Sequence, residues 1–283
     1  MQSLWMIAAS FLFACMGVCV KLAAATHSAV EITFYRSFIS LILMYGLVRL
    51  RGVPLRTSHW RWQVTRGAVG FSALFSYFYA ITLLPLATAV TLNYTSAIFL
   101  ALYLGFAGTQ MRKGMLGALA LGLVGVVLLL KPTFHADQLL GGCIGLASGI
   151  LSGMAYFSVR QLGVRGEPET RTVFYFSLVS TVGAAAWLVF SEIHAIDSHS
   201  GLLLLGVASF ATVAQLAMTR AYSRGKTLMS AALAYSTVIF SSLFGMLFWG
   251  EVLDASAWLA IGLIILSGIA ATHFSRASPV EQD

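Results

Sequence analysis

The segment from Lys113 to Lys131 reads KGMLGALALGLVGVVLLLK, and no charge lies between the two lysines at its ends. A helix of about 20 apolar residues is long enough to cross the roughly 30 Å of hydrocarbon in a lipid bilayer. This segment has that length and that composition, so it predicts a helix that spans a membrane. Other parts of the chain show the same pattern.

The composition of the whole chain agrees with this prediction. Of the 283 residues, 59% are hydrophobic and 10% are charged, and the mean hydropathy is +0.86. An average soluble domain is about 45–50% apolar and about 25% charged. The composition therefore excludes a soluble enzyme, a secreted disulfide scaffold and a disordered chain, and it makes the lipid bilayer a partner of the protein.

Charged and turn-forming residues divide the chain into ten apolar segments joined by short loops. Pro85 separates the third segment from the fourth, and Glu167-Pro168 follows the sixth. The start of the third segment is poorly marked, because Arg66 lies one turn inside it. The predicted transmembrane helices are residues 3–25, 29–50, 63–84, 87–107, 114–131, 139–162, 172–192, 201–221, 227–249 and 255–275.

The basic residues predict the orientation of these helices. With the N-terminus in the cytoplasm, fourteen of the seventeen Lys and Arg residues, Arg66 among them, fall on the cytoplasmic side. This bias is typical of membrane proteins. We therefore expect a multi-pass protein of the cytoplasmic (inner) membrane with both termini in the cytoplasm. The net charge of +7 then reflects topology, and no nucleic-acid partner is predicted.

An internal repeat relates the two halves of the chain. Tyr35 matches Tyr175 at an offset of 140, and residues 93–95 match residues 234–236 at an offset of 141. The matches follow one order across five predicted helices, and their offset drifts by only a few residues, as loop insertions produce. Chance similarity between apolar helices explains any one pair, whereas the ordered series indicates a duplication.

The number of helices in each half determines the geometry of the repeat. Five is odd, so the second half enters the membrane from the side opposite to the first. Such inverted repeats support alternating access, with the binding site near the midplane. The predicted fold is all-α: ten transmembrane helices as two inverted five-helix repeats, 1–133 and 138–276, around a central cavity.

These features resemble the EamA-type transporters of the drug/metabolite transporter superfamily. The resemblance rests on the ten helices, the repeat, Arg36 within the second helix, the Ala80/Ala221 helix ends and the Glu251 turn before a glycine-bearing last helix. It implies a ten-helix bundle with a central cavity that exports small metabolites such as amino acids. One departure is Gln110 at the position that matches Glu251, so a role for that acid in both repeats is not expected.

Polar residues inside the predicted helices are candidates for the substrate pathway. Tyr94 and Tyr235 occupy the middle of their helices, and aromatic faces with amides and hydroxyls suit a small amphipathic or aromatic metabolite. Arg36 is either a counter-ion for a substrate carboxylate or a structural cation. Each of the others either contacts substrate or bonds a neighbouring helix. The candidate substrate-binding residues are Arg36, Tyr79, Asn93, Tyr94, Tyr156, Gln215, Tyr235 and Ser236.

The positions of acidic residues and histidines bear on the driving force for transport. No Asp, Glu or His falls at the middle of a predicted helix. A proton-coupled carrier generally uses such a group. We therefore expect a facilitator or exchanger, or a coupling group near the far mouth such as Glu31. Pairing of Glu31 with Lys21 is the alternative interpretation of that carboxylate.

Two further patterns are interpreted as structural. Gly141, Gly145, Gly149 and Gly153 recur every four residues along the sixth helix, and small residues at that spacing let another backbone approach closely. Cys15 and Cys19 share a helix face, but free cysteines usually behave as small apolar residues. We therefore predict no metal site and no cofactor.

The predicted function is export of a small metabolite, with amino acids, aromatic ones included, as the expected cargo. An importer with the same fold is the first alternative. A membrane enzyme would need a cluster of acids or histidines. The loops offer only the scattered residues Asp137, Glu167, Glu169 and Asp254. A membrane subunit that transports nothing is a further alternative. The expected partners are a small-molecule substrate and lipid, and a monomer is sufficient.

Overall fold

The computed structural model describes residues 2–84, 86–109, 111–131, 138–191, 193–250 and 252–276, and in these ranges it contains helices and no strands. The all-helical fold predicted from the sequence is thereby confirmed. The helices are η1 (Gln2–Leu4), α1 (Trp5–Ala23), α2 (Ala29–Leu50), α3 (Trp60–Leu83), α4 (Leu86–Tyr94), α5 (Ser96–Phe106), α6 (Lys113–Leu130), α7 (Leu139–Val164), α8 (Glu169–Leu188), α9 (Ser198–Arg224), α10 (Thr227–Ala234), α11 (Ser236–Trp249) and α12 (Ala255–Arg276).

Eight helical segments among the described residues are long and apolar enough to cross a membrane. They comprise η1–α1, α2, α4–α5, α6, α7, α9, α10–α11 and α12. The protein is therefore a multi-pass membrane protein. The other two predicted spans form the helices α3 and α8, which carry more polar and charged side chains, including Arg66 in α3 and Arg171 in α8.

The fourth and ninth predicted helices are interrupted, whereas the sequence predicted continuous helices at 87–107 and 227–249. Thr95 separates α4 from α5, and Tyr235 separates α10 from α11. Hydroxyl side chains beside each break donate to the helix's own carbonyls: the Thr95 hydroxyl donates to the carbonyl of Leu92 at 2.5 Å, and the Ser236 hydroxyl donates to that of Leu233 at 2.7 Å. Such bonds compete with the regular helical ladder.

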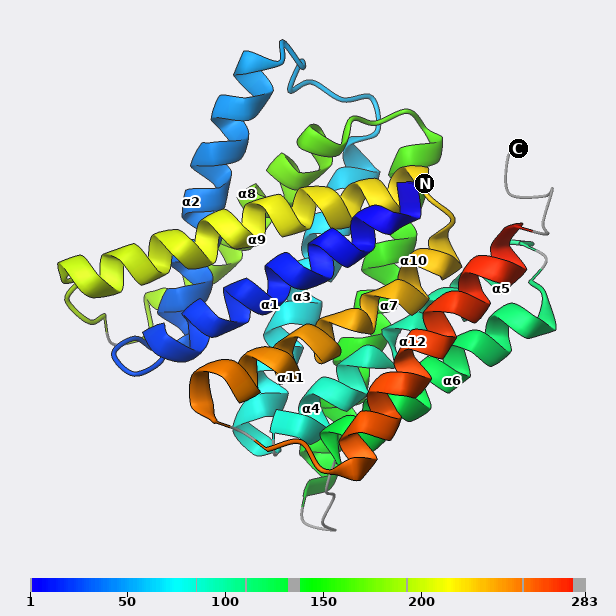
Figure 1. Ribbon diagram of the computed structural model, residues 1–283. Helices are drawn as coiled ribbons and strands as arrows, with labels where there is room; N and C mark the ends of the chain where they lie inside the picture. Colours follow the sequence, from blue (N-terminus) through cyan, green and yellow to red (C-terminus); the bar gives the residue numbers. More distant parts are fainter. Residues whose placement is uncertain are drawn as a thin grey trace.

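Helices from one half of the chain pack mainly against helices of the other half. The helix α3 lies along α7, and α9 lies along α1, as Figure 1 shows for the blue and yellow ribbons. The helix α6 packs against α12, and α2 packs against α8. The main buried apolar cluster is shared by both halves, because it includes Leu100 of α5 together with Leu228 of α10.

Contacts between distant segments define one end of the bundle, which we call the termini end. The backbone N–H of Lys226, between α9 and α10, donates to the hydroxyl of Ser3 at 2.8 Å, and the ammonium of Lys226 contacts the carbonyl of Ser275. The start of the chain, the α9–α10 connection and the last turn of α12 therefore lie together. The contact of Lys21 with the ring of Trp249 lies at the opposite end, where α1 and α11 finish.

The glycine stripe of α7 is a packing surface, as predicted. Gly149 lies so close to α4 that an added Cβ would be 2.6 Å from the carbonyl oxygen of Leu92. An added Cβ on Gly153 would be 2.9 Å from the carbonyl oxygen of Ser96 in α5. These contacts flank Thr95, so the close approach of α7 occurs beside the break between α4 and α5.

The substitution Gly149→Ala should lower the stability of the protein. Overpacking typically costs about 1–3 kcal/mol, since a backbone carbonyl cannot move aside like a side-chain tip. Gly117→Ala in α6 is the matched control, because nothing lies within 4 Å of a Cβ added there and both variants gain the same helix propensity. Apparent melting temperatures in detergent measure the difference. Equal melting temperatures for the two variants would contradict this description of the interface.

Candidate substrate-binding site

A narrow polar cavity lies between α2, α8 and α9. Most of its lining side chains are small and polar or carry donors. Its volume is about 10 Å³, close to the space that one water molecule needs, so the structure holds the cavity nearly closed. The lining residues are Arg36, Ser37, Ser40, Val173, Phe176, Ser177, Ala211, Thr212 and Gln215.

The start of α2 determines how deep Arg36 lies. Ser28 caps the helix: its hydroxyl accepts from the backbone N–H of Glu31 at 3.3 Å, and its own N–H donates to the Glu31 carboxylate at 2.7 Å. This reciprocal pair is a capping box, which marks the first turn of a helix. Arg36 follows about two turns later, roughly 10 Å from the helix start. Its buried Nε has no hydrogen-bond partner among the described residues.

Gln215 faces the same cavity from α9. The side chain is buried, and its Nε2 finds no acceptor in the described part of the chain. Thr212, one turn earlier, is bonded to the hydroxyl of Ser40 at 2.6 Å and ties α9 to α2. The structure thus brings together Arg36 and Gln215, two predicted residues that lie far apart in the sequence, and leaves an unsatisfied donor on each.

Arg66 is a buried residue that sequence reasoning assigned to the cytoplasmic side. The structure places its side chain inside the bundle rather than at a membrane surface: Arg66 is 3% exposed, and its Nε and Nη1 have no partner among the described residues. Its guanidinium carbon lies 4.3 Å from the ring centre of Phe176, which lines the cavity. The reason is that α3 begins at Trp60 rather than at residue 63, so Arg66 lies deeper than the sequence suggested.

A cluster of tyrosines adjoins this region. The rings of Tyr94 and Tyr235 lie 5.9 Å apart, and those of Tyr156 and Tyr222 stack at 4.8 Å with an angle of 14°. All four pack in the main buried apolar cluster, and none of them belongs to the lining of the cavity around Arg36. The sequence singled out three of the four. Tyr222 was missed because the eighth helix was predicted to end at residue 221, whereas α9 continues to Arg224.

Tyr235 occupies a pocket that α6 provides. The residue is fully buried, and its hydroxyl has no described partner. Gly122 of α6 makes room for the ring, because an added Cβ there would lie 2.4 Å from Cδ2 of Tyr235. The break between α10 and α11 therefore places an unsatisfied hydroxyl inside the protein.

Three predicted site residues occupy other positions. The Asn93 amide donates to Ser148 at 3.1 Å and to Ser152 at 3.2 Å, so it fastens α4 to α7. Tyr79 is 43% exposed and stacks on Phe75. Ser236 lines a mostly apolar groove formed by η1, α1, α10, α11 and α12. The structure does not bring these three side chains into the cavity around Arg36.

Glu31 lies in the first turn of α2, at the end of the bundle opposite the termini end. Its carboxylate accepts from the backbone N–H of His194 at 2.6 Å and contacts the His194 ring nitrogen Nδ1 at 2.9 Å. These bonds, together with the bond from Ser28, tie the α1–α2 connection to the loop between α8 and α9. The predicted pair with Lys21 is replaced by this arrangement, and the ammonium of Lys21 lies 3.9 Å from the ring centre of Trp249.

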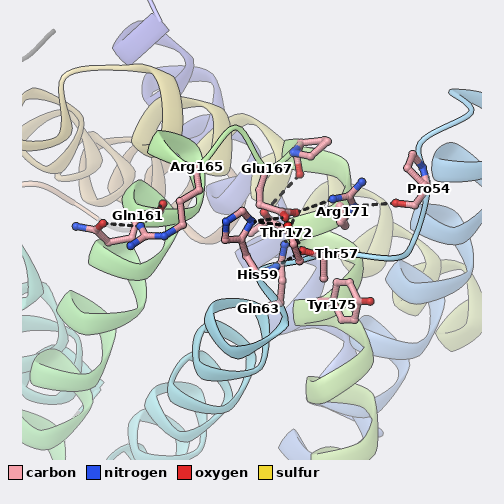
Figure 2. A network of polar contacts seen from close by, with 12 residues as sticks. Pro54, Thr57, His59, Gln63, Gln161, Arg165, Glu167, Arg171, Thr172 and Tyr175 are labelled. Atoms are coloured by element: carbon pink, nitrogen blue, oxygen red, sulfur yellow. Dashed lines mark hydrogen bonds and ion pairs between the residues drawn. The ribbon is translucent and has the colours of Figure 1, made fainter. Parts of the chain in front are cut away.

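A second buried carboxylate, Glu167, lies at the termini end (Figure 2). It accepts from the Thr57 hydroxyl at 2.5 Å and from Nε2 of Gln63 at 3.0 Å, and it contacts Nδ1 of His59 at 3.2 Å. Nη1 of Arg171 completes the set at 3.0 Å. Burial by itself raises the pKa of Glu167, but these hydrogen bonds and the Arg171 charge outweigh it and hold the pKa below its usual value.

The chain matches a known family of membrane proteins over nearly its whole length. The model of the EamA-like transporter family matches residues 1–131 and 139–272. The chain belongs to this family. It is therefore a transmembrane transporter and not an enzyme. In this EamA-like transporter, Gln110 departs from the acidic residue that the resemblance implies, and it matches Glu251 of the second half. Both positions lie outside the described residues.

Several known proteins are similar to this EamA-like transporter. The pseudopaline exporter CntI of Pseudomonas aeruginosa (strain UCBPP-PA14) is 33% identical over 273 residues, which cover 95% of each chain. A riboflavin transporter of Brucella anthropi is 24% identical, with 92% of this chain and 94% of its own covered. A protein of known crystal structure, 20% identical, has the same fold, with a TM-score of 0.87 over 97% of this chain and 98% of its own.

The Glu167 cluster gives this EamA-like transporter an acid-sensitive contact. Because the folded-state pKa is depressed, the stabilisation is present above the usual pKa of 4.5 and is lost as the pH falls through the lower folded value. Glu167→Gln should cost about 3 kcal/mol at neutral pH, since it leaves Arg171 without its charge partner. It should also flatten the acid limb of the melting temperature.

Glu169→Gln provides the control for this measurement. Glu169 pairs with Arg224; the Glu169 side chain is 14% exposed, but its partner is 55% exposed, so water screens this pair more than the Glu167–Arg171 pair and its loss costs less. Melting temperatures in detergent, recorded from neutral pH down to about pH 3.5, compare the two variants. An equal loss of stability in both would show that the Glu167 cluster has no special role.

Proposed function

We propose that the protein is a secondary transporter that works by alternating access and exports a small metabolite, amino-acid-like in its polar groups, across the cytoplasmic membrane. One observation carries the proposal: unsatisfied donors on Arg36 and Gln215 face one cavity between helices of the two halves. Buried polar groups normally have partners, and ionisable groups in membranes mark substrate pathways. The similar exporter and riboflavin transporter support the small-molecule cargo.

We further propose that α3 and α8 also cross the membrane, which makes ten spans in two inverted repeats, 1–133 and 138–276. The packing of helices supports this arrangement, because the contact of α3 with α7 has a counterpart in that of α9 with α1. The contact of α5 with α7 has its counterpart in that of α11 with α1. The helix breaks at Thr95 and Tyr235 fall at corresponding places, and the family model matches two segments.

The two halves are not packed identically, and this difference supports alternating access. The helix α9 also contacts α7 and α8, whereas among the described residues the corresponding contacts of α3 with α1 and α2 are sparse or absent. The α7–α9 contact is tight at the termini end, where a Cβ added to Gly163 would lie 2.4 Å from the carbonyl oxygen of Ser223. In our proposal this closes the cytoplasmic side, and exchange of the two packings opens it.

The orientation in this proposal follows from charge. Arg220, Arg224 and Lys226 lie at the termini end beside the Glu167 cluster, and basic residues favour the cytoplasmic face. Both termini are then cytoplasmic. Within the site we assign substrate contacts to Arg36 and Gln215 and to the tyrosine cluster, and a monomer contains the whole site.

Removal of a central ring tests the site. Tyr94→Ala and Tyr235→Ala should each lower flux in proteoliposomes at least tenfold while the protein stays folded and inserted, because each removes the face on which the substrate packs. Tyr45→Ala is the control, since Tyr45 is 47% exposed on α2. A flux screen with amino acids, aromatic metabolites and organic cations provides the assay. Normal flux in both central variants would remove the tyrosine cluster from the site.

Coupling to protons, in this proposal, runs through Glu31. The described carboxylates lie at the ends of the bundle, and Glu31 is a fully buried one whose oxygens contact the backbone N–H and the ring of His194 across to the second half. Glu31→Gln should therefore abolish any flux driven by an imposed pH gradient while substrate exchange without a gradient persists. Flux measured with and without the gradient separates the two. Gradient-driven flux that survives the substitution would exclude Glu31 as the coupling group.

A further inference from the structure

Two arginines inside the described bundle, Arg66 fully buried and Arg36 partly buried, have no anion beside them. Buried nitrogens on both Arg36 and Arg66 have no hydrogen-bond partner, and Arg66 is 3% exposed. Phe176, whose ring lies 4.3 Å from the Arg66 guanidinium carbon, lines the same cavity as Arg36. A buried cation without a partner is costly, and a second one of the same sign nearby raises the cost.

The carboxylates of the described ranges are all bound elsewhere. Glu31 is held by His194 and Ser28, and Glu167 by Arg171 and its neighbours. The remaining three lie at the ends of the bundle. Glu169 pairs with Arg224, Asp254 contacts Lys131, and Asp197 caps α9 through Ser200. No carboxylate among the described residues is therefore left to neutralise Arg36 or Arg66.

Both arginines lie at the cavity between α2, α8 and α9, Arg36 as part of its lining and Arg66 behind a lining residue. Arg36 lines the cavity between α2, α8 and α9, and Arg66 stacks on Phe176, another residue of its lining. The other buried polar atom of the cavity lining without a hydrogen-bond partner, Nε2 of Gln215, is also a donor. A site that presents only unsatisfied donors selects a ligand rich in acceptors, and a guanidinium matches the geometry of a carboxylate.

The position of Arg66 is built into α3 and α8. The Phe176 face holds its guanidinium by a cation–π contact. Gly70, one turn after Arg66, leaves the space that the guanidinium fills, because an added Cβ would lie 2.1 Å from Nη1. A side chain at position 70 would therefore displace the cation without removing it.

We infer that the central site binds a dianion, a small metabolite with two carboxylate groups, one held by Arg36 and the other by Arg66. This inference rests on the proposed function and narrows its substrate class. Binding neutralises both cations, so the cavity opens around a ligand that replaces their lost hydration. The tyrosine cluster offers rings for the part of the ligand between or beside its carboxylates.

Three matched series of probes test the inference on the purified full-length protein in detergent. Succinate, glutarate and adipate carry two charges, their half-amides carry one, and their diamides carry none at nearly the same size. We expect at least one dicarboxylate to raise the apparent melting temperature and to bind at least tenfold more tightly than its half-amide. The preference should be lost in Arg36→Gln and in Arg66→Gln and weakened in Gly70→Ala.

The stability of the variants without ligand provides a second readout. Arg66→Gln should raise the melting temperature of the ligand-free protein, because it removes a charge that nothing in the described structure neutralises. If Arg66 were a structural cation, Arg66→Gln would instead lower the melting temperature of the ligand-free protein. Arg61→Gln is the control, because Arg61 lies beside Trp60 at the exposed start of α3 and should change neither readout.

The outcomes separate the inference from the function on which it rests. If no dicarboxylate binds more tightly than its diamide, or if Arg66→Gln destabilises the ligand-free protein, the dianion site is wrong. The proposed transporter then still stands if the tyrosine variants abolish flux of some other cargo in the liposome screen. If no cargo in that screen moves, the proposed function itself fails.

Discussion

Hydrocarbon offers no hydrogen-bond partner, and the rest of this structure depends on that constraint. Every backbone polar group inside a bilayer must be satisfied within the protein, so the chain forms helices. Charged groups collect at the ends of the bundle, where Glu31 and Glu167 each gather several hydrogen bonds. Against this background the inward-facing donors on Arg36, Arg66 and Gln215 are exceptions, and such exceptions in membrane proteins usually serve function.

The same constraint shapes how the helices meet. Lipid removes most of the hydrophobic force between helices, so close backbone contact and polar bonds hold them together. The glycines of α7 permit that contact along α4 and α5, and Asn93 adds amide bonds to Ser148 and Ser152 at the same interface. The break at Thr95 lies at this interface, because a Cβ added to Gly149 would lie 2.6 Å from the carbonyl oxygen of Leu92 beside it.

Two carboxylates tie the halves together at opposite ends. Glu31, in the first turn of α2, binds the loop that follows α8, and Glu167, just before α8, binds the segment that precedes α3. The Glu167 cluster includes Arg171 and has more partners than the Glu31 contact, which relies on His194. The Glu167 cluster lies at the same end as the close contact of α7 with α9, where a Cβ added to Gly163 would lie 2.4 Å from the carbonyl oxygen of Ser223.

The sequence by itself determined the membrane solvent, the approximate places of the helices and the packing role of the α7 glycines, because apolar length and helical spacing are local properties. It could not place Arg66, since an arginine near a helix end is cytoplasmic or buried according to where that helix begins and what packs over it. It could not assign Asn93 to Ser148, or Glu31 to His194, because those partners lie far away in the chain. Only the tertiary structure decided which polar groups are satisfied, since satisfaction depends on neighbours from other helices.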